Sequence, residues 1–344
     1  MRAVAVADDR RLVTVERAPE RPLAGQALLE VAYCGICGSD LHFRDVPELF
    51  PAGTVPGHEL TGRIIALADG PGAWQPGDRV CVLPFAQCGE CELCRSGQEQ
   101  VCPHAIANGV GLGTGRPGGY AEQVIVDRRM LFALPDSVDD RAGALTEPLA
   151  VAVRAVEQAG LSPDQPVMVL GAGTIGILIA LVLADRGFEQ VRLLSRNLAR
   201  ARLATTLGLN AVSLEHAPAS EAPACVFECA GTPAAARLAV DAVRPLGKVM
   251  LIGVSLEPLD LLAPALLFKE VELRGVLAYS RANFAAAIDL LARRRIPADA
   301  LITATVPLEQ TEAMFQALAA SGNTHLKVLL APREPPTRAP APQA

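Results

Sequence analysis

The chain is poor in aromatic residues and carries no excess of basic ones. Aromatic side chains make up 4% of its 344 residues, and the formal net charge is −6. A surface that binds nucleic acid or an anionic membrane needs a basic face, so this balance argues against both kinds of partner. A long hydrophobic run is also missing. The longest, Ile175 to Ala184, falls short of the ~20 residues that cross a bilayer.

The first residues, MRAVAVADDRRLVTVE, lack the apolar core and the cleavage site of a secretory signal. We therefore expect a soluble protein of the cytoplasm, with about two domains and a sizeable buried core. It has nine cysteines, an odd number that cannot all pair in disulfide bonds. Since disulfides are rare in a reducing compartment, clustered cysteines there are more often metal ligands or catalytic groups.

Four of these cysteines lie close together in the stretch CGECELCRSGQEQVC, at Cys88, Cys91, Cys94 and Cys102. Four thiolates complete a tetrahedral zinc shell and leave no open position, so we favour a structural zinc that holds a loop together. An iron–sulfur cluster is an alternative, because Cys102-Pro103 fits the bacterial signature, but the seven-residue gap before it does not. Disulfide bonds or a chance clustering of cysteines are further alternatives.

The first third of the sequence is rich in short apolar runs separated by Gly, Pro and Asp. This pattern predicts many short strands and a barrel-like or partly open β domain. The expected strands lie at 2–7, 27–36, 60–68, 78–85 and 120–126.

From about Thr146 the pattern changes to alternating strands and helices. Residues 147–160 have helical spacing and end at a glycine that suits a C-cap, and 284–296 are helical again. Alternating β and α units predict a parallel, doubly wound sheet, so the fold class is α/β. The expected strands of this sheet lie at 166–170, 191–195, 225–231, 248–254 and 271–276.

The predicted domain organisation has the chain leave its first domain and return to it. We expect a catalytic domain with a cysteine lobe at about 84–104, a dinucleotide-binding domain, a return to the first domain, and a Pro-rich tail that is disordered. The boundaries are 1–148, 149–283, 284–332 and 333–344.

The segment GAGTIG, at 171–176, follows an expected strand and opens an apolar helix. In a G-x-G-x-x-G loop the first glycine permits a tight turn, the second lets the backbone approach a pyrophosphate, and the third lets helix and strand pack closely. The helix N-terminus favours the phosphates. We expect Gly171, Gly173, Thr174, Ile175 and Gly176 to contact a dinucleotide; a tight turn without a ligand is the alternative.

The end of the second strand of this unit indicates which dinucleotide binds. NAD-binding proteins usually place Asp or Glu there for the ribose 2′-hydroxyl, but this chain has Ser195 and Arg196. Arg196 would attract a 2′-phosphate, and Ser195 could donate a hydrogen bond to it. We predict a preference for NADP(H) with NAD(H) possible; alternatively, Arg196 only stacks on the adenine.

A second group of metal-ligand residues precedes the dinucleotide loop. Cys37, His58 and Glu59 are good zinc ligands, and Glu147 lies near the predicted domain change. Mixed ligands with a position left open are typical of catalytic zinc. Each residue alone could be something plainer, such as a core histidine, a surface charge, or a core cysteine at Cys34 or Cys37. Their occurrence together beside a dinucleotide loop favours a metal site.

The motifs CGICGSDLH, GHE, the four-cysteine lobe, GGYAEQVIV, TEPLAVAV, GAGTIG and FECAG together resemble the zinc-containing medium-chain dehydrogenase/reductase family. The glutamate after His58 is similar to the branch of sorbitol, butanediol and threonine dehydrogenases. The resemblance covers nearly the whole chain except the tail. It implies a GroES-like catalytic domain, a Rossmann domain, and an active site in the cleft between them. Ser195-Arg196 is the one departure, and it puts NAD use in doubt.

The resemblance implies two zinc ions per chain. Cys37 and His58 would bind the catalytic zinc, with Glu59 as a third ligand or close behind, and Glu147 would bind the metal or its water. The lobe Cys88, Cys91, Cys94 and Cys102 would bind the structural zinc. Ser39 and His42 match proton-relay positions, and Asp40 matches the partner of the zinc-binding histidine.

These residues suit hydride transfer between NAD(P) and an alcohol. Zinc as a Lewis acid makes the hydroxyl acidic, Ser39 and His42 offer the proton a route to solvent, and the nicotinamide accepts the hydride. We predict a zinc-dependent dehydrogenase of alcohols or polyols that forms a homodimer or homotetramer. The alternatives are a zinc-free enone or quinone reductase of the same fold and a non-enzymatic dinucleotide-binding protein. The sequence does not choose the substrate; Phe43, Phe50 and Tyr279 either line the pocket or belong to the core.

Overall fold

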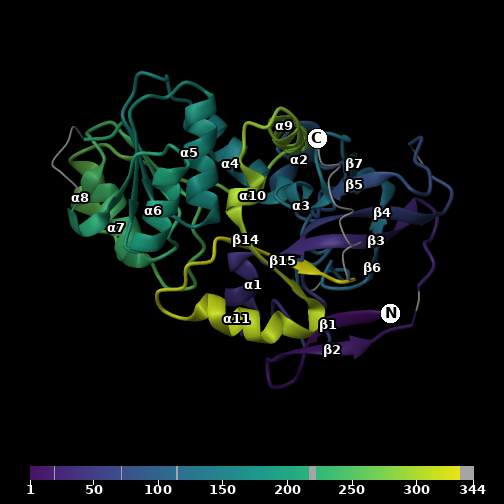
Figure 1. Cartoon of the computed structure of the whole chain (residues 1–344). Coiled ribbons are helices and arrows are strands. Elements are labelled where there is room, and N and C mark those ends of the chain that lie inside the picture. The colour runs from purple at the N-terminus through teal and green to yellow at the C-terminus, as the bar shows by residue number, and fades with distance from the viewer. Residues whose placement is uncertain (19, 71, 114, 217–221, 334–344) are drawn as a thin grey trace, which may run out of the picture.

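The computed structural model describes residues 1–18, 20–70, 72–113, 115–216 and 222–333. The chain forms two units, each built around its own sheet, with α4, α9 and α10 where the units meet (Figure 1). The predicted disorder of 333–344 falls almost wholly outside the described residues. No helix in the described ranges is long and apolar enough to cross a membrane.

One unit contains a six-stranded parallel sheet in the order β10-β9-β8-β11-β12-β13. The strand β8 and its neighbour β11 are buried at every position, as expected for the centre of a sheet covered on both faces. By contrast, all four residues of β13, at one edge, are exposed. The strands are β8 (Val167–Leu170), β9 (Val191–Ser195), β10 (Ala211–Ser213), β11 (Cys225–Glu228), β12 (Lys248–Leu251) and β13 (Glu272–Gly275).

The other unit contains a mixed sheet in the order β14-β15-β3-β4-β5-β7, with β6 also paired to β3, beside the separate hairpin β1-β2. The C-terminal strands belong to this sheet, because β15 pairs antiparallel with β3. The strands are β1 (Arg2–Val6), β2 (Leu12–Glu16), β3 (Gln26–Gly35), β4 (Glu59–Leu67), β5 (Arg79–Val82), β6 (Gln123–Asp127), β7 (Leu131–Ala133), β14 (Ile302–Pro307) and β15 (Lys327–Ala331).

The helices begin and end at sequence signals. Asn197 caps α6 by accepting from the Arg200 N–H, a Ser280–Asn283 capping box starts α9, and Gly160 ends α4 in the left-handed conformation with φ 57°. The helices are α1 (Gly38–Phe43), α2 (Glu92–Arg95), α3 (Asp140–Gly143), α4 (Thr146–Ala159), α5 (Thr174–Asp185), α6 (Leu198–Thr206), α7 (Pro233–Ala242), α8 (Ala263–Leu267), α9 (Arg281–Ala292), α10 (Ala298–Leu301) and α11 (Thr311–Ala319).

Candidate active site

Two strand ends bring the candidate metal ligands together. The antiparallel strands β3 and β4 pair Gly35, the last residue of β3, with Glu59, the first residue of β4. Cys37 follows β3 and is the N-cap of α1, whereas His58 immediately precedes β4. The pairing therefore places residues that are far apart in sequence at one edge of the sheet.

The side chains of Cys37, His58 and Glu59 offer a sulfur, a nitrogen and an oxygen that all lie within 4.8 Å of one another. His58 and Glu59 are buried, and Cys37 is partly buried. Cys34, the other candidate in this stretch, is a core residue, and burial raises the pKa of its thiol well above its usual value. The donor set suits zinc, which accepts thiolate, imidazole and carboxylate ligands.

The surroundings of His58 favour a cation. Asp40 is 1% exposed, and its Oδ1 lies 3.6 Å from His58 Nδ1; neither atom has a hydrogen-bond partner in the described part of the chain. Burial opposes protonation of His58, but Asp40, Cys37 and Glu147 together raise its pKa well above the usual value. A bound metal cation would compensate the same negative charges, so these residues fit a zinc ion.

Glu59 also forms a buried ion pair that the sequence analysis missed. Lys327 Nζ, on β15, lies 2.7 Å from Glu59 Oε1 and 2.5 Å from Oε2, and donates to the carbonyl oxygen of Ile36 at 2.9 Å. Both side chains are almost fully buried. The carboxylate thus faces an ammonium group while its oxygen stays near Cys37 and His58.

Glu147 lies in the first turn of α4 and lines the same cavity, but it is outside the set of three donors that lie within 4.8 Å. Its Oε1 accepts a hydrogen bond of 2.8 Å from the Tyr279 hydroxyl. Burial, together with the charge of Glu59, raises the pKa of Glu147 to about 7, although His58 and Tyr279 oppose the shift. The group is therefore poised to gain or lose a proton near neutral pH.

One cavity of about 410 Å³ joins both units. Its walls include Cys37, Ser39 and His42 from the β-rich unit, and Ile175 and Gly231 from the parallel unit. Ser39 Oγ donates to Cys37 Sγ at 3.1 Å, and His42 is exposed on the same helix. Metal donors, relay candidates and Ile175 of the dinucleotide loop thus line one cavity.

Of the three aromatic residues proposed for the pocket, Phe43 and Phe50 line this cavity. Tyr279 is instead fully buried and packs edge-on against Phe85, with ring centroids 5.6 Å apart. Its hydroxyl donates a hydrogen bond to Glu147, so Tyr279 orients a cavity residue and does not line the cavity itself.

The glycine loop has the predicted geometry. Gly171 adopts φ +107°, a conformation that favours glycine, and a Cβ on Gly176 would lie 1.9 Å from the carbonyl oxygen of Gly171. Beside Gly173 there is open space, as close approach of a ligand requires. Thr174 and Ile175 form the first turn of α5. Glu228 supports the adjacent loop, because its Oε1 accepts from the N–H groups of Ala230 and Gly231 at 2.8 Å each.

Two arginines follow β9, Arg196 directly after the strand and Arg200 in the first turn of α6. Arg196 is exposed and lines a small cavity with Gly171 and Thr232. Ser195 is buried, and its hydroxyl bonds the backbone of Asn197. Arg200 was not predicted from the sequence; burial lowers the pKa of its guanidinium, and its Nε has no partner among the described residues. Its place in the first turn of the helix that follows Arg196 was the available signal.

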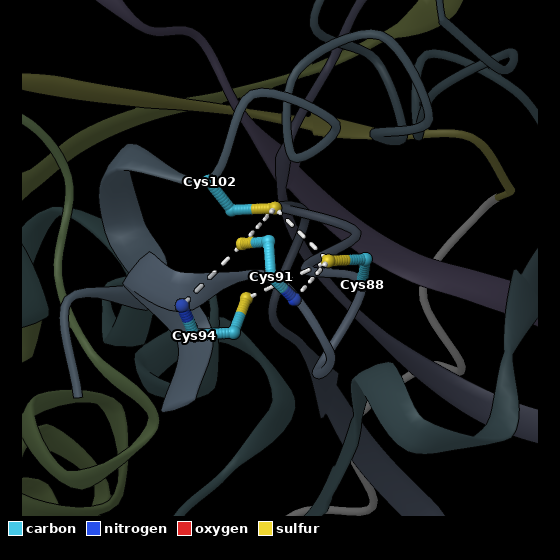
Figure 2. A group of neighbouring side chains, drawn as sticks. All are labelled: Cys88, Cys91, Cys94 and Cys102. Atoms are coloured by element: carbon cyan, nitrogen blue, oxygen red, sulfur yellow. Dashed lines mark hydrogen bonds between the residues drawn. The ribbon is translucent and has the colours of Figure 1, made fainter. Parts of the chain in front are cut away.

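The four-cysteine lobe forms a compact set of sulfurs, as Figure 2 shows. The sulfur pairs 88–94 and 91–102 are 3.9 Å apart, and the pair 102–88 is 3.7 Å apart. These distances exceed the ~2.05 Å of a disulfide. They match the edge of about 3.8 Å expected for a tetrahedron with Zn–S bonds of about 2.3 Å. The N–H groups of Glu90 and Cys91 lower the pKa of Cys88 to about 6, which favours the thiolate.

Two family models match the chain: the alcohol dehydrogenase GroES-like domain at residues 23–136 and the glucose dehydrogenase C-terminus at 140–331. A sorbitol dehydrogenase of Halalkalibacterium halodurans is 30% identical, over 92% of this chain and 95% of its own length. An (R,R)-butanediol dehydrogenase of Bacillus subtilis is 29% identical, over 94% and 97%.

Two solved structures cover 96% of this chain and 99% of their own. One, from Sinorhizobium meliloti 1021 and described as a zinc-binding dehydrogenase, is bound to NADP, with a TM-score of 0.86 and 28% identity. The other, an alcohol dehydrogenase from Escherichia coli CFT073, is complexed with NADH, with a TM-score of 0.87 and 26% identity.

The chain therefore belongs to the zinc-containing medium-chain dehydrogenase/reductase family, in its polyol dehydrogenase-like branch. It is an NAD(P)-dependent oxidoreductase of alcohols or polyols with a GroES-like unit and a Rossmann-type parallel sheet. The predicted family, fold class and reaction class are confirmed.

Proposed function

We propose that this enzyme uses a catalytic zinc held by Cys37, His58 and Glu59, with Glu147 close by, to oxidise a diol or polyol with NADP⁺ or to reduce the matching carbonyl. The observation that carries the proposal is one cavity lined both by the three donors and by Ile175 of the glycine loop. A zinc-free enone reductase would have no use for these donors.

Zinc at this position would supply a Lewis acid that polarises the substrate oxygen. Ser39 and His42 lie three residues apart on α1, so both can face the cavity. The Ser39 hydroxyl can turn from Cys37 Sγ to the substrate oxygen, and the exposed His42 can pass the proton to solvent. Residues Gly171 to Gly176 would hold the pyrophosphate of the cofactor, and the nicotinamide would supply the hydride acceptor or donor.

The second zinc belongs to Cys88, Cys91, Cys94 and Cys102, where it stabilises the lobe. The sulfur tetrahedron is the support for this assignment, because it matches a closed four-thiolate shell. Two zinc ions per chain are thus expected by metal analysis, and one or none would contradict the proposal.

The proposed preference for NADP(H) rests on positive charge at the ribose end of the cofactor cleft. Among the described residues Arg196 forms no ion pair, and the partly buried Arg200 forms none either, since Asn323 Oδ1 accepts from its Nη2. The buried Ser195 hydroxyl is engaged with Asn197, so we now assign the 2′-phosphate mainly to the two arginines.

The test compares kcat/KM for NADP⁺ and NAD⁺ in the wild type, Arg196→Ala and Arg202→Ala. Arg202 is an exposed arginine on α6, the helix that follows Arg196, and serves as the matched control. Loss of a charge-assisted phosphate contact should lower kcat/KM for NADP⁺ about ten-fold or more in Arg196→Ala and leave NAD⁺ nearly unchanged. A wild type that prefers NAD⁺ would refute the assignment.

The exposed edge of the parallel sheet is the proposed contact with a second copy. Next to β13 lie three strongly exposed residues, Leu262, Leu267 and Phe268, at 63%, 71% and 89%. In a two-fold antiparallel pairing centred on Leu273, Glu272 of one copy would face Arg274 of the other. Because this charge pattern complements itself and an open edge favours strand pairing, we propose a homodimer through β13 and α8.

The substrate should be identified with the zinc-loaded enzyme. An NADP⁺-reduction screen across secondary alcohols, vicinal diols and sugar alcohols, run with the zinc-loaded and zinc-stripped protein, tests the function. We expect turnover of a diol or polyol that requires zinc. Equal activity after zinc removal would contradict the proposed role of the metal.

A further inference from the structure

Tyr120 lies behind the candidate metal ligands, outside the cavity that they share. Its side chain is fully buried, and its hydroxyl donates to Asp40 Oδ2 at 2.7 Å. Its role was not predictable from sequence, because nothing in its local pattern connects Tyr120 with Asp40, 80 positions away.

The hydrogen bond from the Tyr120 hydroxyl makes the two carboxylate oxygens of Asp40 unequal: one accepts hydrogen bonds, and the other faces His58. Oδ2 accepts from Tyr120 and from the backbone N–H of Cys37, the latter at 3.2 Å. Oδ1 is left facing His58 Nδ1 at 3.6 Å, and neither of these two atoms has another partner in the described ranges. An Asp40 fixed in this way can accept only at Oδ1 from an Nδ1–H of His58, which leaves Nε2 of the imidazole as the electron-pair donor.

The backbone and ring of Tyr120 hold the segment before His58 as well. The Tyr120 N–H donates to the carbonyl oxygen of Pro56 at 3.0 Å, and the Gly119 N–H donates to that of Gly57 at 2.7 Å. A Cβ on Gly57 would lie 2.3 Å from Tyr120 Cδ1, so the ring packs directly against the backbone that carries His58.

We propose that Tyr120 is a positioning residue for the catalytic metal centre: its hydroxyl orients Asp40, which in turn fixes the orientation and tautomer of His58. This inference depends on the proposed metal site at Cys37, His58 and Glu59. The phenol does not line the cavity and would touch neither substrate nor cofactor, so we expect its effect on metal affinity.

The test is a zinc competition measurement with a chelator on Tyr120→Phe, which keeps the ring and removes only the hydroxyl. Loss of an outer partner of a metal-binding histidine commonly costs 10–100-fold in metal affinity, and we expect about ten-fold weaker zinc binding at the catalytic site. Thr311→Val is the matched control: it removes another buried hydroxyl, which donates to Leu308, from α11. It should leave the zinc affinity unchanged.

A double-variant cycle with Asp40→Asn separates positioning from a general loss of stability. If Tyr120 acts through Asp40, the ten-fold effect should disappear in the Asp40→Asn background. Equal weakening in both backgrounds, or unchanged affinity in Tyr120→Phe, would overturn the proposal. A wild type that binds only the four-thiolate zinc would instead refute the proposed metal site itself.

Should Tyr120→Phe not fold, fluorotyrosine NMR of the wild type provides the same test. The sequence has three tyrosines, so the Tyr120 signal can be assigned with Tyr33→Phe and Tyr279→Phe. The Tyr120 resonance should shift when the catalytic site is loaded with zinc. An unchanged resonance would contradict a connection between the hydroxyl and the metal centre.

Discussion

At the scale of single residues, the site concentrates buried charge around the proposed metal position. Glu59, Asp40 and Glu147 are all nearly inaccessible to water. Lys327 offsets Glu59, His58 faces Asp40, and Glu147 has only the Tyr279 hydroxyl as a direct partner among the described residues. Such an excess of acid is costly without a cation, so bound metal should stabilise the fold.

The raised pKa of Glu147 predicts how stability depends on pH in the zinc-free protein. In the folded protein the pKa of Glu147 is about 7, above the usual 4.5. The contribution of Glu147 to the free energy of unfolding is therefore fully present below pH 4.5 and is lost as the pH rises to about 7. The cost above pH 7 is roughly 3 kcal/mol. Glu147→Gln removes it, so the zinc-free variant should be more stable than the wild type at pH 8 and similar to it at pH 4.5.

Urea unfolding of both zinc-free proteins at the two pH values measures this difference. The amide oxygen introduced by Glu147→Gln can still accept from the Tyr279 hydroxyl, so the comparison isolates the charge. A variant less stable than the wild type at pH 8 would show that the buried carboxylate is better compensated than its surroundings indicate.

Some residues of the site could not be found from sequence. Cys37, His58 and Glu59 were predicted because three good zinc ligands occur together before a dinucleotide loop and match a known family pattern, and the structure brings their donor atoms together. Lys327 is 268 positions from Glu59, and it sits in a strand buried at every position, where no alternation marks an inward-facing charge. Only the antiparallel pairing of β15 with β3 brings it to Glu59.

At the scale of elements, sequence signals correctly predicted those features that depend on the backbone preferences of neighbouring residues. The end of α4 at Gly160 and the strand–turn–helix of the glycine loop followed from backbone preferences. The short strand β10 was not predicted, and the exposure of β13 was not either, because edge position depends on strand order and not on composition.

The cysteine lobe should behave as an independent structural element. Cys91 caps α2, and its sulfur accepts from the Cys94 N–H at 3.4 Å. Cys91→Ser should lose the lobe's zinc and lower Tm by at least about 5 °C, because three thiolates no longer close the shell. The measurements are zinc content and thermal unfolding.

NADPH affinity is the control for this variant, since the glycine loop belongs to the parallel sheet unit and should retain its cofactor site. Cys102→Ser should behave in the same way, because each thiolate fills one corner of the tetrahedron. An inactive variant with unchanged Tm would contradict a purely structural role.

At the scale of the whole molecule, the proposed contact between copies should respond to a single charge. Leu267→Asp places a carboxylate in the apolar patch beside β13 and should shift the mass from that of an oligomer toward the 36.0 kDa of one chain. Light scattering after size exclusion measures the mass.

Leu23→Asp is the matched control, since Leu23 is 72% exposed, close to the 71% of Leu267, but lies in the other unit. It should leave the mass of the wild type unchanged. An unaltered mass in Leu267→Asp would contradict an interface through β13 and α8.

The central claim is that Cys37, His58 and Glu59 bind one catalytic zinc beside the dinucleotide. The most direct measurement is the zinc content of Cys37→Ser against the wild type, with turnover and NADPH binding measured on the same samples. We predict two zinc ions per chain in the wild type, and in the variant one zinc ion, no turnover and intact NADPH binding. A variant that keeps two zinc ions, or full turnover, would contradict the account.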